Sequence, residues 1–303
     1  MFKVDFISMP VLDNMYRLNG SKVHSIFKNV VNFEYRGKLI SIQNSNVPKG
    51  PLSISIKETI NFLDLPIKME DVITVKKDVI YIGSISVNIE RPLIWDPSLK
   101  YYSLLLCNNK KHTNKIKSLV ILNGKSGGIK EEVLSIIAGD SYKTYYDKNK
   151  SNVVNVLEEV YFDFYNKNQI DAAIKLSSLI GYGAGLTPAG DDFLVGVMSV
   201  LHHCKLSSIG ISEFYEKLCS EILKNSYKTT MVSKTFLEEG TCARFSESFH
   251  KLYEAMWSVN SEELYKAVIS MMSIGHSSGT DGLCGVLWGL YLVSNLNINT
   301  NGG

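Results

Sequence analysis

The chain has 303 residues, of which 45% are hydrophobic and 20% charged, and it carries a formal net charge of +2. This length allows one large domain or two ordinary ones, and the composition is that of a folded globular protein. Because the charges nearly balance, there is no electrostatic case for binding nucleic acid.

Three features of the sequence favour a cytoplasmic protein that does not enter a membrane. The longest apolar run, Leu283–Val293, is too short to span a bilayer, and residues 1–7 lack the pattern of a secretory signal. The five cysteines are widely spaced and form no Cys-x-x-Cys pair. We therefore expect reduced thiols, as in other cytosolic proteins.

Residues 1–105 are predicted to form a β-rich domain. Short segments rich in β-branched and aromatic residues recur there, separated by turn sequences such as Arg36–Lys38 and Pro48–Pro51. The predicted strands are Val23–Phe27, Val30–Tyr35, Leu39–Ile42, Leu52–Ile56, Val72–Val75, Val79–Ile82 and Ile85–Ile89. This spacing predicts a small sandwich or barrel.

Residues 106–127 are predicted to be a connection, with the lysines around Lys110 in a solvated loop and a glycine-rich end, and residues 128–303 a helical domain. The predicted helices are Ile129–Ile137, Asn152–Tyr165, Gln169–Ile180, Asp191–Cys204, Ser212–Leu223, Thr230–Glu239, Ser246–Trp257, Ser261–Met272 and Asp281–Val293. The fold class is therefore α+β, with a β domain followed by a helical domain.

Two glycine-rich segments, Gly181–Gly196 and Gly275–Gly285, each lead into an apolar, helix-like stretch. When the two are superposed, matched positions are Gly190 with Gly279, Asp192 with Asp281, Leu194 with Leu283, Gly196 with Gly285 and Val197 with Val286. The helical domain is thus predicted to carry two pseudo-repeated helix starts, and to hold its functional site there.

The order Thr187-Pro188 predicts a helix with Thr187 as N-cap and proline in its first turn. Such an opening leaves backbone N–H groups free for an anion or a polar substrate, with Gly183, Gly185 and Gly190 as positions of close backbone approach. By contrast, Gly196, Gly285 and Gly289 lie inside their helices and are predicted to let the two helices pack closely, near a local twofold axis.

Asp192 and Asp281 are candidate catalytic residues because the repeat retains both, whereas Asp191, matched by Thr280, could simply complement the helix dipole. His276 lies in the second glycine–serine turn, where an acid–base role and a structural role are equally open. Further candidates for substrate binding are Thr187, Asp191, Lys228, Thr229, Thr230, Ser233, Ser277, Ser278, Gly279 and Thr280. If a metal ion such as Mg²⁺ is used, its ligands would be Asp191, Asp192 and Asp281.

The segment Gly183–Gly196 resembles the signature of a bacterial family long catalogued as a domain of unknown function, which includes the AllH-type subunit of oxamate carbamoyltransferase. Similar segments are Gly275–Asp281, Thr229–Ser233, Pro48–Pro51 and Trp95–Pro97. The resemblance implies a subunit in allantoin and purine catabolism that works with FdrA-like and AllG-like subunits. The implied reaction joins oxamate and carbamoyl phosphate, reversibly, to give oxalurate and phosphate.

Three readings of the chain remain open from the sequence. The first is a carbamoyltransferase subunit of a hetero-oligomer, with a homodimer also possible. The second is a metal-dependent hydrolase, because proteins resembling ADP-ribosylglycohydrolases also place Gly-Asp-Asp and Thr-Asp pairs at helix starts to hold magnesium. The third is a non-catalytic scaffold, in which the glycines only allow close helix packing.

Overall fold

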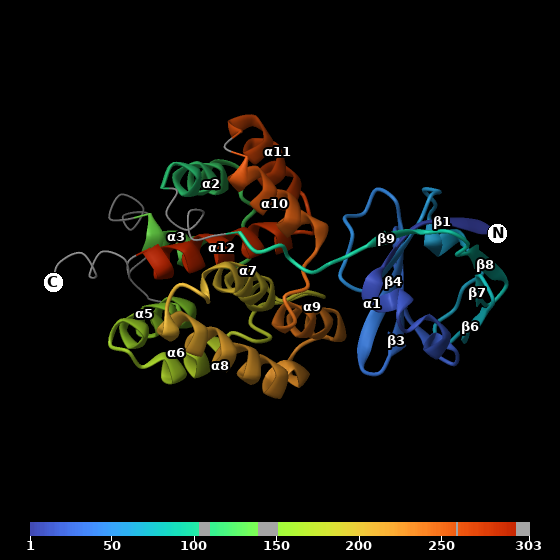
Figure 1. The fold of residues 1–303 in the computed structure, drawn as a ribbon, viewed down its shortest axis with the longest axis horizontal. Coiled ribbons are helices and arrows are strands. Elements are labelled where there is room, and N and C mark those ends of the chain that lie inside the picture. Colours follow the sequence, from blue (N-terminus) through green and yellow to red (C-terminus); the bar gives the residue numbers. More distant parts are fainter. Residues whose placement is uncertain (103–109, 139–150, 259, 295–303) are drawn as a thin grey trace. The chain divides into compact units, whose positions relative to one another are not determined.

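The computed structural model describes residues 1–102, 110–138, 151–258 and 260–294. The chain divides into two compact units (Figure 1). The β unit comprises Met1–Ser98 with Arg244–Glu247, and the helical unit comprises Leu99–Ala243 with Ser248–Gly303. This order of a strand-rich part and a helical part confirms the predicted α+β class.

The β unit is one nine-stranded, barrel-like sheet with the strand order β2-β3-β4-β5-β1-β8-β7-β6, to which β9 adds by pairing with β1. The strands are β1 (Phe2–Ser8), β2 (Lys22–Ile26), β3 (Val30–Tyr35), β4 (Lys38–Asn44), β5 (Ser53–Ile56), β6 (Ile73–Lys76), β7 (Val79–Ile82), β8 (Ile85–Asn88) and β9 (Leu93–Trp95). The sheet curls because main-chain hydrogen bonds join its two ends: Val23 N donates to Asp71 O, and Ile73 N to Ser21 O. Its inward-facing side chains, including Phe33, Ile42 and Ile54, form an apolar core.

Strand β1 was not among the predicted strands, although it is central to the sheet. It pairs with β5 on one side, and on the other with β8 through Phe2 and Lys3 and with β9 through Phe6, Ile7 and Ser8. The alternation of Phe2, Val4 and Phe6 is the signal that would have indicated it.

The helical unit is built from α2 (Lys110–Asn123), α3 (Lys130–Ile137), α5 (Asn152–Tyr165), α6 (Gln169–Ser177), α7 (Ala189–Cys204), α8 (Ile209–Asn225), α9 (Met231–Thr241), α10 (Glu247–Trp257), α11 (Ser261–Met272) and α12 (Ser278–Ser294). The predicted helices all occur, and two of them, α5 and α11, have the predicted bounds. The prediction of a solvated loop around Lys110 is wrong, because Ile116, Leu119 and Val120 bury one face of a helix there.

Helices α7 and α12, which contain the two repeats, lie side by side in the middle of the helical unit (Figure 1). A Cβ added to Gly196 would lie 2.1 Å from the carbonyl oxygen of Gly282, and one added to Gly285 would lie 2.0 Å from that of Phe193. Phe193 and Gly282 occupy matched positions in the repeat, as do Gly196 and Gly285. The contacts are therefore reciprocal, as expected for helices related by a local twofold axis.

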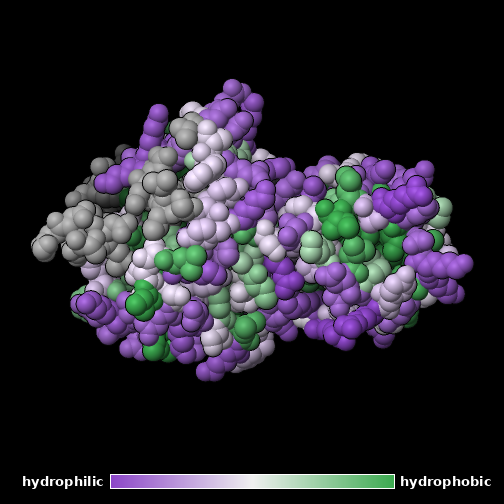
Figure 2. All heavy atoms as spheres, viewed as in Figure 1, coloured by the Kyte–Doolittle hydropathy of each residue, from purple (hydrophilic) through white to green (hydrophobic). Residues whose placement is uncertain are grey.

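The cysteines do not all match the expectation of reduced thiols. Cys219, Cys242 and Cys284 are free, but Cys204 is disulfide-bonded, so the expectation fails at that residue. Among the described helices, none has the length and apolar character needed to cross a membrane. Figure 2 shows patches of apolar side chains between polar ones on the visible surface of both units.

Candidate functional site

The two glycine-rich helix starts are in direct contact, and we call them the paired openings: residues 181–192 before and within the first turn of α7, and residues 275–281 at the start of α12. The hydroxyl oxygens of Thr187 and Ser278 lie 2.7 Å apart and are hydrogen-bonded. Thr187 is therefore not the N-cap that the sequence predicted. Helix α7 begins at Ala189 after Pro188, with no side-chain cap, because the Thr187 hydroxyl reaches the other opening instead.

Asp191 is a structural residue of the first opening. Its side chain is 1% exposed, and both carboxylate oxygens are used, since Oδ1 accepts from the Gly181 N–H at 2.8 Å and Oδ2 from the Thr229 hydroxyl at 2.5 Å. Burial raises the pKa of Asp191, while these donors and the nearby Ser233 hydroxyl lower it. The residue ties the turn before α7 to the turn before α9.

Asp192 differs from its neighbour because its Oδ2 atom is buried and has no hydrogen-bond partner in the described structure. Burial raises the pKa of this carboxyl well above its ordinary value. The Ser278 and Thr187 hydroxyls beside it lower that pKa, and the negative charge of Asp281 raises it. A buried polar atom without a partner costs free energy, so this oxygen is available to a ligand.

Asp281, which is matched to Asp192 in the repeat, also has a buried carboxyl oxygen without a partner among the described residues. It is fully buried, its Oδ1 accepts from the Ile129 N–H at 2.8 Å, and its Oδ2 has no partner among the described residues. Burial raises its pKa to about 6, against the lowering effect of the Ile129 N–H and the Ser277 hydroxyl. Each opening therefore supplies one buried carboxyl oxygen that is not hydrogen-bonded.

A third glycine-rich segment, residues 124–128, lies against the second opening, although from the sequence it was expected only to end a connection. Gly128 covers Asp281 so closely that a Cβ there would lie 2.1 Å from Oδ1. Lys125 N donates to the Thr280 hydroxyl at 3.1 Å, and Lys125 Nζ donates to Gly275 O at 2.7 Å. His276 borders the same segment, with Nε2 3.7 Å from the position of a Cβ on Gly127.

The first turn of α7 offers fewer free N–H groups than the sequence predicted. Gly190 N donates to Tyr182 O, and Asp191 N and Asp192 N both donate to Pro188 O. The free donors lie just before the helix, in the exposed stretch Gly183–Leu186, whose backbone N–H groups donate to no described residue. Positive φ angles at Gly183 (106°) and Gly185 (103°) explain why glycine is needed in this stretch.

Gly190 and Gly279, both predicted to approach substrate, instead approach the protein's own backbone. A Cβ would lie 2.1 Å from Leu179 O at Gly190, and 1.7 Å from Met271 O at Gly279. The two glycines are matched in the repeat and have the same use, which is to let each helix start pack against the end of the preceding helical segment.

The candidates around residue 230 lie beside the first opening. Thr229 contacts Asp191, as above, and the Thr230 hydroxyl donates to Leu186 O at 2.6 Å while accepting from Ser233 N as the N-cap of α9. Lys228 places its ammonium 5.9 Å from the centre of the Tyr227 ring, and its carbonyl packs on Gly181. In the described part of the chain, no three His, Cys, Asp or Glu residues are grouped so that they could hold a metal ion.

Comparison with known protein families finds two matches, one in the helical unit and one in the β unit. Residues 179–290, which include both openings, match the family model described as oxamate carbamoyltransferase subunit AllH. Residues 5–93 match the AllH family N-terminal domain. The chain belongs to the AllH family. The word subunit in the family's description implies partner subunits in a complex. No solved structure matches this AllH-family chain significantly.

Proposed function

We propose that this AllH-family chain binds substrate within an oxamate carbamoyltransferase-type complex, with the amide end of the substrate held between Asp192 and Asp281. The observation that carries the proposal is the pair of buried Oδ2 atoms without partners, one at each opening. A substrate –NH₂ group has two N–H donors, so it could satisfy both oxygens at once.

The same site suits the anionic end of the substrate. Carbamoyl phosphate and oxamate each combine an amide with an anionic group. The free backbone N–H groups of Gly183–Leu186 are donors for an anion, and the Thr187 and Ser278 hydroxyls lie between this stretch and Asp192.

In the proposed reaction the amide nitrogen of oxamate attacks the carbamoyl carbon of carbamoyl phosphate. The new C–N bond forms as the C–O bond to phosphate breaks, and the attacking nitrogen loses one proton. Asp281, with its pKa near 6, is suited to accept that proton near neutral pH. His276 is the alternative proton acceptor at this opening.

We further propose that FdrA-like and AllG-like subunits complete the complex, in the cytoplasm, and that the chain alone has little activity. Exposed apolar side chains support a role for partner subunits. On the helical unit, Ile170 and Ile209 are 48% and 89% exposed and line one surface hollow on α6 and α8. The other residues that line this hollow, Ser212, Glu213, Glu216 and Lys217, are polar, and exposed apolar side chains with a polar rim are found on surfaces that other proteins cover.

The test is calorimetric titration of carbamoyl phosphate into the chain reconstituted with its partner subunits. We expect Asp192→Asn to weaken binding by about tenfold or more, because it replaces one of the two acceptor oxygens with an NH₂ group that only donates. Asp171→Asn is the matched control, since it removes the same charge from an exposed position on α6. Equal affinities for the two variants would refute the proposed role of Asp192.

A further inference from the structure

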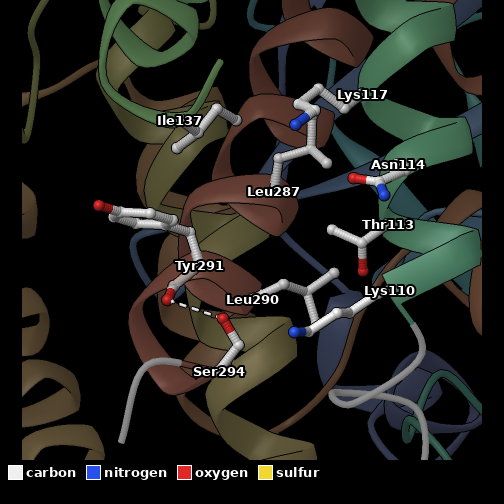
Figure 3. Close-up of a pocket in the computed structure, with 9 residues that line it drawn as sticks. All are labelled: Lys110, Thr113, Asn114, Lys117, Ile137, Leu287, Leu290, Tyr291 and Ser294. Atoms are coloured by element: carbon white, nitrogen blue, oxygen red, sulfur yellow. Dashed lines mark hydrogen bonds between the residues drawn. The ribbon is translucent and has the colours of Figure 1, made fainter. Parts of the chain in front are cut away.

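A cavity of about 160 Å³ lies away from the paired openings, between α2, α3 and the second half of α12 (Figure 3). Its apolar wall is formed by Ile137 of α3 and by Leu287 and Leu290 of α12. Tyr291 borders it, with its ring stacked on Tyr161 at a centroid distance of 5.4 Å. This wall is fixed by packing in the core of the helical unit.

The opposite wall is polar and positively charged. It consists of four residues spaced three, four and seven apart on one face of α2, namely Lys110, Thr113, Asn114 and Lys117. Figure 3 shows the two lysine side chains extending from α2 toward α12. Neither Lys110 nor Lys117 forms an ion pair with any residue that the structure describes, and the described residues of the cavity lining include no Asp or Glu.

The size and the charge of this cavity together select a class of ligand. The cavity is partly open to solvent, since Lys110 and Asn114 are exposed, and its volume is close to that of an enclosed apolar cavity that holds one benzene molecule. Lysine ammonium groups at the edge of an apolar surface can pair with an anion while their stems stay in apolar contact. We propose that the cavity binds a small organic acid, with its apolar body on Leu287 and Leu290 and its carboxylate at Lys110, Asn114 and Lys117.

This cavity is separate from the paired openings. Leu287 follows Asp281 by about 9 Å along α12, given a rise of 1.5 Å per residue, and none of the residues lining the cavity belongs to either opening. Binding of an organic acid here does not depend on the proposed carbamoyltransferase function, so each proposal can fail without the other.

The experiment titrates benzoate, by calorimetry, into the full chain and into two variants of α2. Lys117→Met keeps the apolar stem and removes the charge that faces the cavity. Lys111→Met removes the same charge from an exposed position outside the cavity lining, and serves as the matched control. Benzyl alcohol, which has the same ring without the charge, tests whether the carboxylate is recognised.

We expect wild type and Lys111→Met to bind benzoate with the same affinity, and Lys117→Met to bind it about tenfold more weakly. Benzyl alcohol should bind wild type about as weakly as benzoate binds Lys117→Met. In Leu290→Phe, whose larger side chain enters the cavity, benzoate binding should be lost. The proposal is overturned if wild type binds no benzoate at millimolar concentration, or if Lys117→Met and Lys111→Met bind it equally well.

Discussion

The two openings have the same pattern of residues but are held in place by different parts of the chain. At the first, Asp191 fastens the opening to its own preceding turn at Gly181 and to Thr229 before α9. At the second, Asp281 and Thr280 fasten it to the distant segment 124–129, through Ile129 N and Lys125 N. The two helix starts are therefore similar in sequence, but the hydrogen bonds that hold them in place are different.

What the two openings do share is a buried carboxyl oxygen that has no partner among the residues the structure describes, on Asp192 in one and on Asp281 in the other. Structural aspartates such as Asp191 have their oxygens satisfied by the protein. An unsatisfied pair at matched positions is costly to keep, and in our proposal the substrate supplies the missing donors. The comparison thus separates the supporting residues from the candidate substrate-binding residues.

The largest expected effect concerns the helix crossing that brings the openings together. Gly285→Ala should lower the free energy of unfolding by about 4 kcal/mol, because the new methyl would lie 2.0 Å from Phe193 O, which is backbone and cannot easily move. Gly282→Ala, three residues earlier on α12, is the control. Its methyl would meet the flexible end of Met271 at 3.1 Å, so urea denaturation should show little loss.

Similar stabilities for the two alanine variants would contradict this account of the crossing. They would mean that α7 and α12 can separate slightly without cost, and that the reciprocal glycine contacts do not set the distance between the openings.

The second prediction is a pH dependence at the second opening. Because the pKa of Asp281 is raised to about 6 in the folded protein from 3.8, the folded state binds more protons than the unfolded state between about pH 4 and 6. The free energy of unfolding should therefore fall as the pH rises through this window. In Asp281→Asn this contribution is absent. Between pH 4 and pH 7 the free energy of unfolding of the variant should therefore rise by up to about 3 kcal/mol relative to that of wild type.

Urea denaturation of both proteins at pH 4, 5, 6 and 7 measures this difference. Parallel curves of stability against pH for wild type and Asp281→Asn would show that Asp281 ionises normally in the folded state, and would remove the argument for a proton acceptor at this position.

The third prediction contrasts the adjacent aspartates of the first opening. Asp191→Ala should lower the free energy of unfolding by about 2 kcal/mol, because it leaves the Gly181 N–H and the Thr229 hydroxyl without their acceptor. Asp192→Ala removes an oxygen that has no partner among the described residues, together with the contacts of the carboxyl with the Thr187 and Ser278 hydroxyls, and should cost less. A larger loss for Asp192→Ala than for Asp191→Ala would reverse the assignment of supporting and substrate-binding residues.

The smallest effect is expected where the two openings touch. Thr187→Val removes the hydrogen bond to Ser278 with little change in shape, and should cost about 1 kcal/mol in thermal or urea unfolding. The double variant with Ser278→Ala should cost no more than the single one, since both remove the same bond. Additive losses would indicate that the two hydroxyls act independently.

The sequence predicted the helices best where local signals are complete. Helices α5 and α11 begin as predicted because Ser151 and Asn260 accept hydrogen bonds from the first-turn N–H groups. At helix α7 the expected cap is wrong, because Pro188 and not Thr187 precedes the first helical residue, and the Thr187 hydroxyl is used in a contact between segments far apart in sequence. A local rule for caps cannot anticipate such a contact.

The candidate site was predicted only in part for the same reason. The repeat itself identifies Asp192 and Asp281, but the covering segment 124–128 is brought to Asp281 by tertiary packing. Its glycines were visible in the sequence, as was the apolar spacing of Ile116, Leu119 and Val120 in α2. No short-range sequence pattern links these glycines to the second opening, which lies about 150 residues later in the chain.

The most direct test of the central claim is a double-mutant cycle on the affinity of the reconstituted complex for carbamoyl phosphate. If Asp192 and Asp281 hold one amide group together, Asp192→Asn and Asp281→Asn should each weaken binding by about tenfold, and the double variant should bind no more weakly than the single ones. Losses that add to within about 0.5 kcal/mol, or single variants that bind as tightly as wild type, would contradict a shared site.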